Sequence, residues 1–327
     1  MKILYTPPRG LGDMIFSLPL LHSLKNAYPD SQIYVPIPDD DVKKQILNLI
    51  GFIRPTPRYL PLPNQDPLAS ERRKASIARD TKKKYYFEKL IFDKYLNGES
   101  YDLSLVPKTF RIDTINCDTQ VTELDLKRNG FNKKELHMVD RFLEFANYLG
   151  IERVLSFELD FDKTKIPVLL SGRQIKNDRP YILFSLGAST EDRKWTSKGY
   201  SEVSDFCDSK GYDVILVGTG SEADLARKIK RAKDYIHDTV PETGYSIDLE
   251  NFARLAFNAK AVLSGDTGFT HIADAIGTNV VGLFGPGSPK KYAPYNNRKN
   301  IISRYDIDKS VRNIRSKDVI SKLEELI

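Results

Sequence analysis

The sequence contains little cysteine, histidine, methionine or tryptophan, with 2, 4, 3 and 1 of these among its 327 residues. Cys117 and Cys207 lack the spacing of metal ligands, and no Ser-His-Asp or Cys-His arrangement indicates a nucleophilic enzyme. Cys207 falls on the apolar face of a helical pattern. We therefore expect a buried free thiol there, which suits a reducing compartment.

Long apolar runs are also missing. No stretch of about 18 apolar residues is present, so the sequence predicts that nothing spans a membrane. Met1 and Lys2 lead directly into an apolar strand pattern at residues 3–5, so we expect no signal peptide. With 40% hydrophobic and 29% charged residues, the composition is typical of a soluble globular protein, and we expect it in the cytoplasm.

The charge balance is positive, with a formal net charge of +6 and a pI near 9.0, which favours anionic partners. Residues 54–100 hold eleven Lys and Arg against six Asp and Glu, and Lys82, Lys83 and Lys84 precede an aromatic-rich pattern there. Two interpretations remain open: an interfacial segment that meets a membrane or an anionic acceptor, and a solvated basic turn before a packed helix. Interleaved acidic residues and the lack of a basic stripe argue against nucleic acid as a partner.

The order of elements predicts an α/β protein with two doubly wound, Rossmann-like parallel sheets. Strand, glycine loop and helix patterns occur twice, beginning at residues 2–12 and again at 181–189. Apolar runs that alternate with helical patterns predict parallel sheets covered by helices on both faces. The charged, proline-bearing stretch 160–179 is the expected linker, so we place the domains at residues 1–165 and 166–327.

The most informative stretch covers residues 261–289. Two apolar runs flank a turn and a helical pattern, which predicts a strand, turn, helix, strand unit. The helix N-terminus carries partial positive charge and free amides, so it can bind an anion. A capped helix with a structural histidine is the alternative interpretation. The candidate anion-binding residues are Asp266, Thr267, Gly268 and His271.

Three sets of motifs resemble the family 9 glycosyltransferases, the heptosyltransferases of the bacterial lipopolysaccharide inner core. The resemblance covers nearly the whole chain and is weakest at residues 52–99. The motifs are Asp266-Thr267-Gly268 with His271 and Phe284-Gly285-Pro286; Arg9-Gly10-Leu11-Gly12-Asp13; and Ser185 to Ser189 with Lys194-Trp195 and Glu222. The resemblance implies the GT-B fold, in which two such domains face each other across a cleft and the last helix, about residues 316–327, packs back on the N-terminal domain.

The resemblance also implies an inverting transferase that moves a heptose from a nucleotide diphosphate, most simply ADP-heptose, to a lipopolysaccharide or lipooligosaccharide core acceptor. It would act at the cytoplasmic face of the inner membrane on an anionic glycolipid. The nucleotide sugar is a co-substrate, and no cofactor or metal is expected. Asp39-Asp40-Asp41 lies where a helix is expected to begin, which accounts for its acidity without a metal.

Gly287-Ser288 replaces a threonine-aspartate pair common in the family, which leaves the sugar open. The alternatives that remain are a related transferase with another nucleotide sugar or acceptor, a sugar epimerase, and a non-catalytic protein that binds nucleotides or polyanions.

Asp13 closes the first glycine loop. From the residues alone it is an N-cap or a general base that takes the proton of an acceptor hydroxyl; the resemblance implies the base. Arg9, Gly10 and Gly12 form the loop on the acceptor side. Ile15 stands where a dinucleotide fingerprint requires a third glycine, so a Rossmann cofactor site is not expected.

The second glycine loop supplies the other expected donor contacts, and each has a plain structural alternative. Lys194 would meet the diphosphate or lie on the surface, and Arg193 could share or take its role, because the family often places a residue between this lysine and the tryptophan. Glu222 would hold the ribose or start a helix, and Ile247 would line the base pocket or fill the core. Ser189 and Thr190 would donate hydroxyl hydrogen bonds to the diphosphate.

Overall fold

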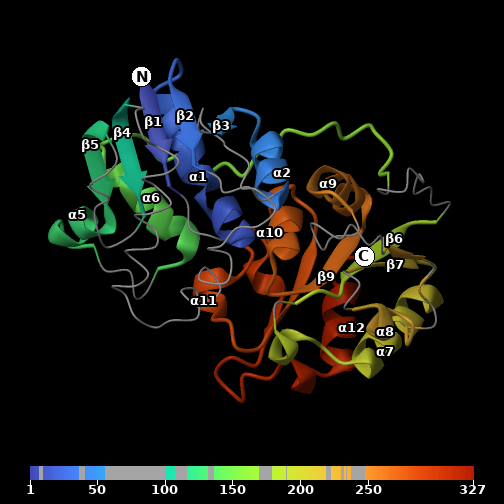
Figure 1. The fold of residues 1–327 in the computed structure, drawn as a ribbon. Helices are drawn as coiled ribbons and strands as arrows, with labels where there is room; N and C mark the ends of the chain where they lie inside the picture. The colour runs from blue at the N-terminus through green and yellow to red at the C-terminus, as the bar shows by residue number, and fades with distance from the viewer. Residues whose placement is uncertain are drawn as a thin grey trace, which may run out of the picture. The chain divides into compact units, whose positions relative to one another are not determined.

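The chain forms two compact α/β units in a computed structural model, each built on one parallel sheet (Figure 1). The first unit comprises Met1–Arg9, Pro19–Asn132 and Phe142–Leu155; the second comprises Gly10–Leu18, Lys133–Arg141 and Ser156–Ile327. The structure describes residues 1–6, 10–36, 41–55, 100–107, 116–131, 136–168, 179–188, 190–218, 222–229, 232, 234–236 and 247–327.

The sheet of the first unit has the order β3-β2-β1-β4-β5. Its strands are β1 (Lys2–Tyr5), β2 (Gln32–Val35), β3 (Ile53–Pro55), β4 (Ser100–Val106) and β5 (Asn116–Thr122), and every pairing among them is parallel. The helices are α1 (Leu11–Ala27), α2 (Asp41–Ile50), α5 (Glu123–Arg128) and α6 (Met138–Tyr148), of which α1 and α6 each begin within the second unit. Ile3, Leu4 and Tyr5 are fully buried, as expected for a strand covered on both faces.

The sheet of the second unit has the order β11-β10-β9-β6-β7-β8, again with parallel pairing throughout. Its strands are β6 (Tyr181–Ser185), β7 (Asp213–Val217), β8 (Asp234–Ile236), β9 (Ala261–Gly265), β10 (Val280–Phe284) and β11 (Ile301–Ser303). The helices are η1 (Glu191–Arg193), α7 (Ser197–Ser209), α8 (Ala223–Ala226), α9 (Leu249–Asn258), α10 (Gly268–Ala275), α11 (Pro289–Tyr292), η3 (Arg298–Asn300), η4 (Val311–Asn313) and α12 (Ser316–Glu324). These two parallel sheets confirm the predicted fold class.

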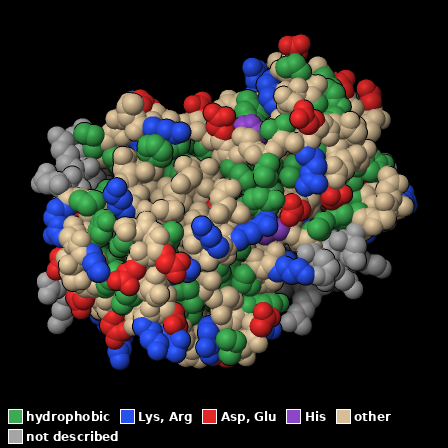
Figure 2. Space-filling model, turned by 180° about the vertical axis from the view of Figure 1, so that it is seen from behind, with side chains coloured by type: hydrophobic (Ala, Val, Ile, Leu, Met, Phe, Trp, Pro, Cys, Tyr) green, Lys and Arg blue, Asp and Glu red, His purple; other side chains and the backbone are tan. Residues whose placement is uncertain are grey.

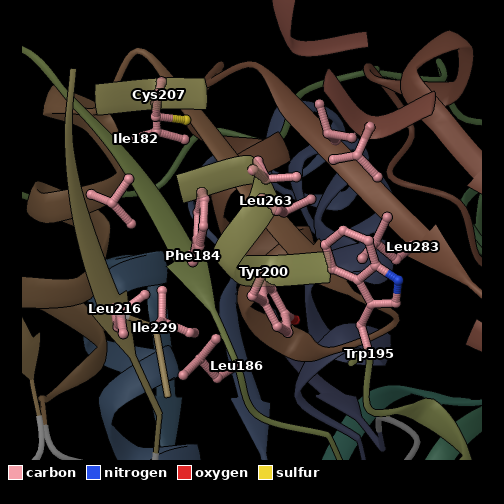
Figure 3. Close-up of a cluster of buried hydrophobic side chains, with 14 of the residues drawn as sticks. Ile182, Phe184, Leu186, Trp195, Tyr200, Cys207, Leu216, Ile229, Leu263 and Leu283 are labelled. Carbon is pink, nitrogen blue, oxygen red and sulfur yellow. The ribbon is translucent and has the colours of Figure 1, made fainter. Parts of the chain in front are cut away.

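Helices cover both faces of the second sheet, with α7 and α12 on one side and α9 and α10 on the other (Figure 1). On the α7 side, alternate strand residues such as Phe184 and Leu263 pack against Tyr200 in one buried cluster (Figure 3). Trp195 belongs to the same cluster, and its indole N–H donates to the Ile314 carbonyl at 3.0 Å, which satisfies this buried donor.

Cys207 lies in the same cluster and is fully buried, which confirms the predicted free thiol (Figure 3). Burial raises the pKa of this thiol to about 12, so it stays protonated and unreactive at neutral pH.

The last helix packs within its own unit, and its expected contact with the N-terminal domain stays a prediction. Val319 and Leu323 of α12 are buried in the cluster of the second unit, and the helix packs on α7 and β10. The two residues lie four apart and form one apolar face, which covers strand side chains of its own unit.

The predicted domain boundary also differs from the structure. The stretch that follows Leu155 already packs in the second unit, where the Arg254 guanidinium donates to the Asp162 carbonyl at 3.2 Å and Phe161 contacts Phe257. Composition placed the linker about ten residues too late, because a charged segment can dock through its backbone and a few rings. Gly10–Leu18 and Lys133–Arg141 also belong to the second unit, which no linear boundary could express.

Surface charge is mixed on the face shown in Figure 2, where Lys and Arg are interspersed with Asp and Glu. In the part of the chain that the structure describes, no helix has the length and apolar character needed to cross a membrane.

Candidate active site

Several loops of the second unit leave the sheet at one edge. Strands β6, β9 and β10 are neighbours, and register pairs Ser185 with Ser264 and Leu283 with Gly265 at their carboxyl ends. The loops that follow these strands carry Lys194, Asp266 and Gly287. Ligands of open parallel sheets bind outside the carboxyl ends of the strands, so this edge is where a site is expected.

Asp266 lies in the turn between β9 and α10 and forms an ion pair with Arg193, whose Nη1 is 3.3 Å from Oδ2. Burial raises the pKa of the Asp266 carboxyl, and the Arg193 guanidinium opposes that shift. Gly287 packs so closely on this carboxylate that a Cβ there would collide with Oδ2. A glycine at 287 therefore lets the two loops meet around Asp266.

Within the described part of the chain, no side chain caps the N-terminus of α10. Thr267 occupies the N-cap position, but its hydroxyl lies 3.3 Å from the hydroxyls of Ser264 and Thr270 instead of accepting from the helix. The Thr270 hydroxyl donates to the Gly265 carbonyl, and its oxygen lies 2.7 Å from the Ser264 hydroxyl. Amides of the first turn that no side chain caps are suited to bind an anion beside Asp266.

Lys194 faces a different group from its neighbour Arg193. Its ammonium lies 2.6 Å from Glu191 Oε1 and 3.3 Å from Glu222 Oε1. The hydrogen bond to Glu191 is the main cause of the raised pKa of Lys194, which therefore stays charged. Glu222 is 2% exposed, whereas the Glu191 side chain is 79% exposed. The two adjacent cations thus pair with different carboxylates, and Arg193 is the one that contacts Asp266.

Asp13 is the third residue of α1, so it is not the N-cap, which was the structural alternative to its role as a general base. Its carboxylate reaches back to the backbone amide of Gly10, which lowers the Asp13 pKa, while burial raises it by more. The Arg141 guanidinium also lowers it. Asp13 and Asp266 belong to one compact unit, and the charge of Asp13 raises the pKa of Asp266. The two carboxylates are therefore electrostatic neighbours, each with an arginine of its own.

Arg141 and Tyr292 also belong to this cluster, although no sequence motif indicated them. Burial and then the charges of Asp13 and Asp266 raise the pKa of the Tyr292 phenol, so this ring belongs to the same charge cluster. His137 links the start of α6 to the end of α11. Its Nε2–H donates to the Ala293 carbonyl at 2.8 Å, and its Nδ1 accepts from the Val139 amide at 3.2 Å. No local pattern announces such a contact between residues more than 150 positions apart.

His271 and Ile247 are both placed inside the protein. The His271 side chain is 4% exposed, and its ring contacts Phe16 at a centroid distance of 4.3 Å. Burial, with a smaller effect of His137, lowers the pKa of His271 to about 3, so the ring is neutral. Ile247 is almost fully buried just before the N-cap of α9. Contact of either residue with a donor stays a prediction.

Some predicted residues lie outside the described part of the chain, and others are placed without a test of their role. Thr190 is exposed at the start of η1, and Gly10 and Gly12 lie at the start of α1. Among the residues that the structure describes, no three His, Cys, Asp or Glu side chains are arranged to hold a metal ion. The residues named in the sequence analysis that lie outside the described part of the chain are Arg9, Lys82, Lys83, Lys84, Ser189, Asp39 and Asp40.

A parallel α/β unit with an uncapped helix N-terminus and neighbouring carboxylates beyond its strand ends is suited to hold an anionic ligand. The model of glycosyltransferase family 9 (heptosyltransferase) matches residues 117–319. The chain belongs to this family and is a glycosyltransferase.

Individual relatives are distant. The chain is 28% identical over 171 residues to lipopolysaccharide core heptosyltransferase OpsX of Haemophilus influenzae, a match that covers 52% of this chain and only 48% of that protein. It is 24% identical to lipopolysaccharide heptosyltransferase 2 of Salmonella typhimurium, over 92% of this chain and 88% of the relative. Among solved structures, Escherichia coli heptosyltransferase WaaC with ADP has a TM-score of 0.69 at 19% identity, and the match covers both chains completely. That likeness supports the fold.

Proposed function

We propose that this glycosyltransferase moves a heptose from ADP-heptose, with inversion, to a core sugar of lipopolysaccharide or lipooligosaccharide. The family and the names of the relatives support the heptosyl group and the core acceptor. ADP is bound in the WaaC structure, whose fold this chain shares, which supports the adenine nucleotide. The observation that carries the proposal is the pair of carboxylates, Asp13 and Asp266, beside the uncapped N-terminus of α10.

In this mechanism Asp13 is the general base. Its carboxylate takes the proton of the acceptor hydroxyl as that oxygen attacks the anomeric carbon from the face opposite the nucleotide. The bond between the anomeric carbon and the phosphate oxygen breaks, and its electron pair leaves with ADP. Inversion follows from this single displacement. Asp13 must be ionised to accept the proton, and the Gly10 amide and Arg141 oppose the effect of burial on its pKa.

The departing diphosphate gains negative charge, and two features of the site would stabilise it. The amides of the first turn of α10, which no described side chain caps, would donate to a phosphate at this helix end. Arg193 stands beside them, paired with Asp266, and its planar guanidinium suits a phosphate. Lys194 forms ion pairs with Glu191 and Glu222, whereas Arg193 pairs with Asp266 beside the N-terminus of α10. Arg193 is therefore the stronger candidate for contact with the diphosphate. Asp266 would then accept hydrogen bonds from hydroxyls of the donor sugar.

The remaining partners are proposed on the same basis. The nucleotide sugar is consumed as a co-substrate, and the reaction needs neither a cofactor nor a metal. The acceptor is an anionic glycolipid, so the enzyme would work at the cytoplasmic face of the inner membrane. Lys82, Lys83 and Lys84 are our candidates for contact with the acceptor or the membrane surface.

The test is a transfer assay with ADP-heptose and a deacylated core acceptor, in which ADP release is followed and the product anomer is assigned by NMR. We expect ADP release that depends on the acceptor and a product of inverted configuration. Release without an acceptor, or a changed sugar still attached to ADP, would indicate hydrolysis or epimerisation instead. A parallel panel of GDP- and UDP-sugars decides the donor, since a ligand at about 100 times its dissociation constant adds about 2.7 kcal/mol of stability.

A further inference from the structure

The first turn of α1 packs on the start of α10 with two glycines at the contact. A Cβ on Gly12 would lie 2.7 Å from Cδ2 of the His271 ring. A Cβ on Gly268 would lie 2.6 Å from Cδ2 of Leu11. Real Cβ atoms do not approach other atoms so closely. Each helix therefore presents a glycine to a side chain of the other, which brings the two backbones together.

The His271 ring is enclosed at this contact. It lies against Phe16 with the ring planes tilted by 55°, and Phe16 also meets His137 edge to face at 5.3 Å. The ring is almost fully buried, and its Nδ1 has no hydrogen-bond partner among the residues that the structure describes. A buried nitrogen without a partner costs about 1–3 kcal/mol, so this position is not one that stability alone would favour.

The His271 ring also lies near the carboxylate of Asp266, the proposed contact of the donor sugar. His271 Nε2 is 4.0 Å from Asp266 Oδ1, too far for a hydrogen bond but close enough for one to form after a small shift. Asp13 follows Gly12 directly in the chain. The imidazole therefore stands between the backbone that carries the proposed base and the carboxylate at the donor end of α10.

We propose that His271 is a positioning residue: its ring supports the first turn of α1 at Gly12 and so sets the place of Asp13 relative to Asp266. This inference rests on the proposed role of Asp13 as base. It differs from direct donor binding, because it requires a ring of fixed size behind Gly12 and no contact with the nucleotide. Near-attack geometry is sensitive to such support, since a shift of about 1 Å can cost about a hundredfold in rate.

A double-mutant cycle tests the inference. Gly12→Ala adds a methyl group against the ring, and His271→Ala removes the ring. We expect each single variant to lower kcat at least about tenfold while the Kd for ADP changes less than about threefold. In the His271→Ala background, Gly12→Ala should cost less than about threefold, because the added methyl finds room. If His271 only stabilised the fold, the cost of Gly12→Ala in kcat would be the same with and without the ring.

The matched control is the same cycle with His137→Ala. His137 also contacts Phe16, but none of its atoms is among those nearest to a Cβ on Gly12. Gly12→Ala should therefore lower kcat by the same factor whether or not His137 is present. Should Gly12→Ala fail to fold, Gly268→Ala with Leu11→Ala gives the reciprocal cycle across the same contact. Independent effects of Gly12→Ala and His271→Ala on kcat, in protein that binds ADP normally, would overturn the inference.

Failure of the proposed function would look different. The parent would then release no ADP from ADP-heptose in the presence of the acceptor. The cycle is read in parallel in the unfolding temperature with ADP present, which needs no transfer. Coupling between positions 12 and 271 in that measurement would keep the supporting contact, and its absence would reject the contact as well.

Discussion

Replacement of Asp13 by asparagine should make the protein more stable and much less active. The substitution keeps the shape of the side chain and removes its charge. Loss of a general base costs about 100-fold to 10,000-fold in turnover, and a hundredfold loss corresponds to about 2.7 kcal/mol of transition-state stabilisation. Donor affinity should change less than about threefold, because Arg193 and Asp266 are untouched.

The stability side follows from the sign of the pKa shift. Burial raises the pKa of Asp13 above 3.8, so the folded state favours the neutral acid. The contribution of this group to stability is present at low pH and is lost as the pH rises through the raised pKa. At neutral pH the ionised carboxylate costs stability, and Asp13→Asn removes that cost. We expect a rise of about 1–3 °C in the unfolding temperature, since about 1 kcal/mol shifts Tm by about 2–4 °C in a domain of this kind.

The assays are acceptor-dependent ADP release, calorimetric titration with ADP, and scanning calorimetry at pH 7. Asp318→Asn is the control, because Asp318 is also a carboxylate paired with an arginine, at 2.8 Å from Arg315, yet lies far along the chain on α12. It should leave turnover unchanged. Turnover of Asp13→Asn within about fivefold of the parent would refute the base assignment. A lowered Tm would refute the argument from burial.

Three further predictions concern charge. Arg193→Ala should raise the Kd for ADP at least tenfold, about 1.4 kcal/mol, whereas Lys194→Ala should mainly lower Tm, because it deprives a buried carboxylate of this ammonium; the reverse order would contradict the assignment. Glu191→Gln should leave the Kd for ADP within about threefold of the parent, because its partner is Lys194 and not Arg193 and an exposed ion pair contributes at most about 1 kcal/mol; a larger change in calorimetric titration would return Lys194 to the diphosphate. Changing the lysines at 82–84 to Gln should weaken binding to anionic vesicles at low salt with ADP affinity unchanged; equal binding would leave them a solvated face.

The sheets could be predicted because their signal is local. Strands such as β6 and β9 are buried on both faces, so they appear in the sequence as continuous apolar runs, and each is followed by a glycine loop and a helical pattern. The turn at Asp266 could be located for the same reason. Helix α12 shows the limit of this signal. Its apolar face predicts that it packs on other elements, but amphipathicity does not say on which ones; in the structure this face covers strand side chains of its own unit.

The candidate site could be predicted as a set of residues but not as a set of pairs. Arg193 and Lys194 are adjacent in the chain, yet one ends the short helix η1 and the other follows it, so their side chains leave the backbone in different directions. One meets Asp266 and the other meets Glu222. Pairing depends on where strands β7 and β9 end in space, and that position is fixed by the register of the sheet. A motif aligned on Lys194 and Trp195 could not carry this information, because an inserted or missing residue at that point exchanges the two cations while the composition of the loop stays the same.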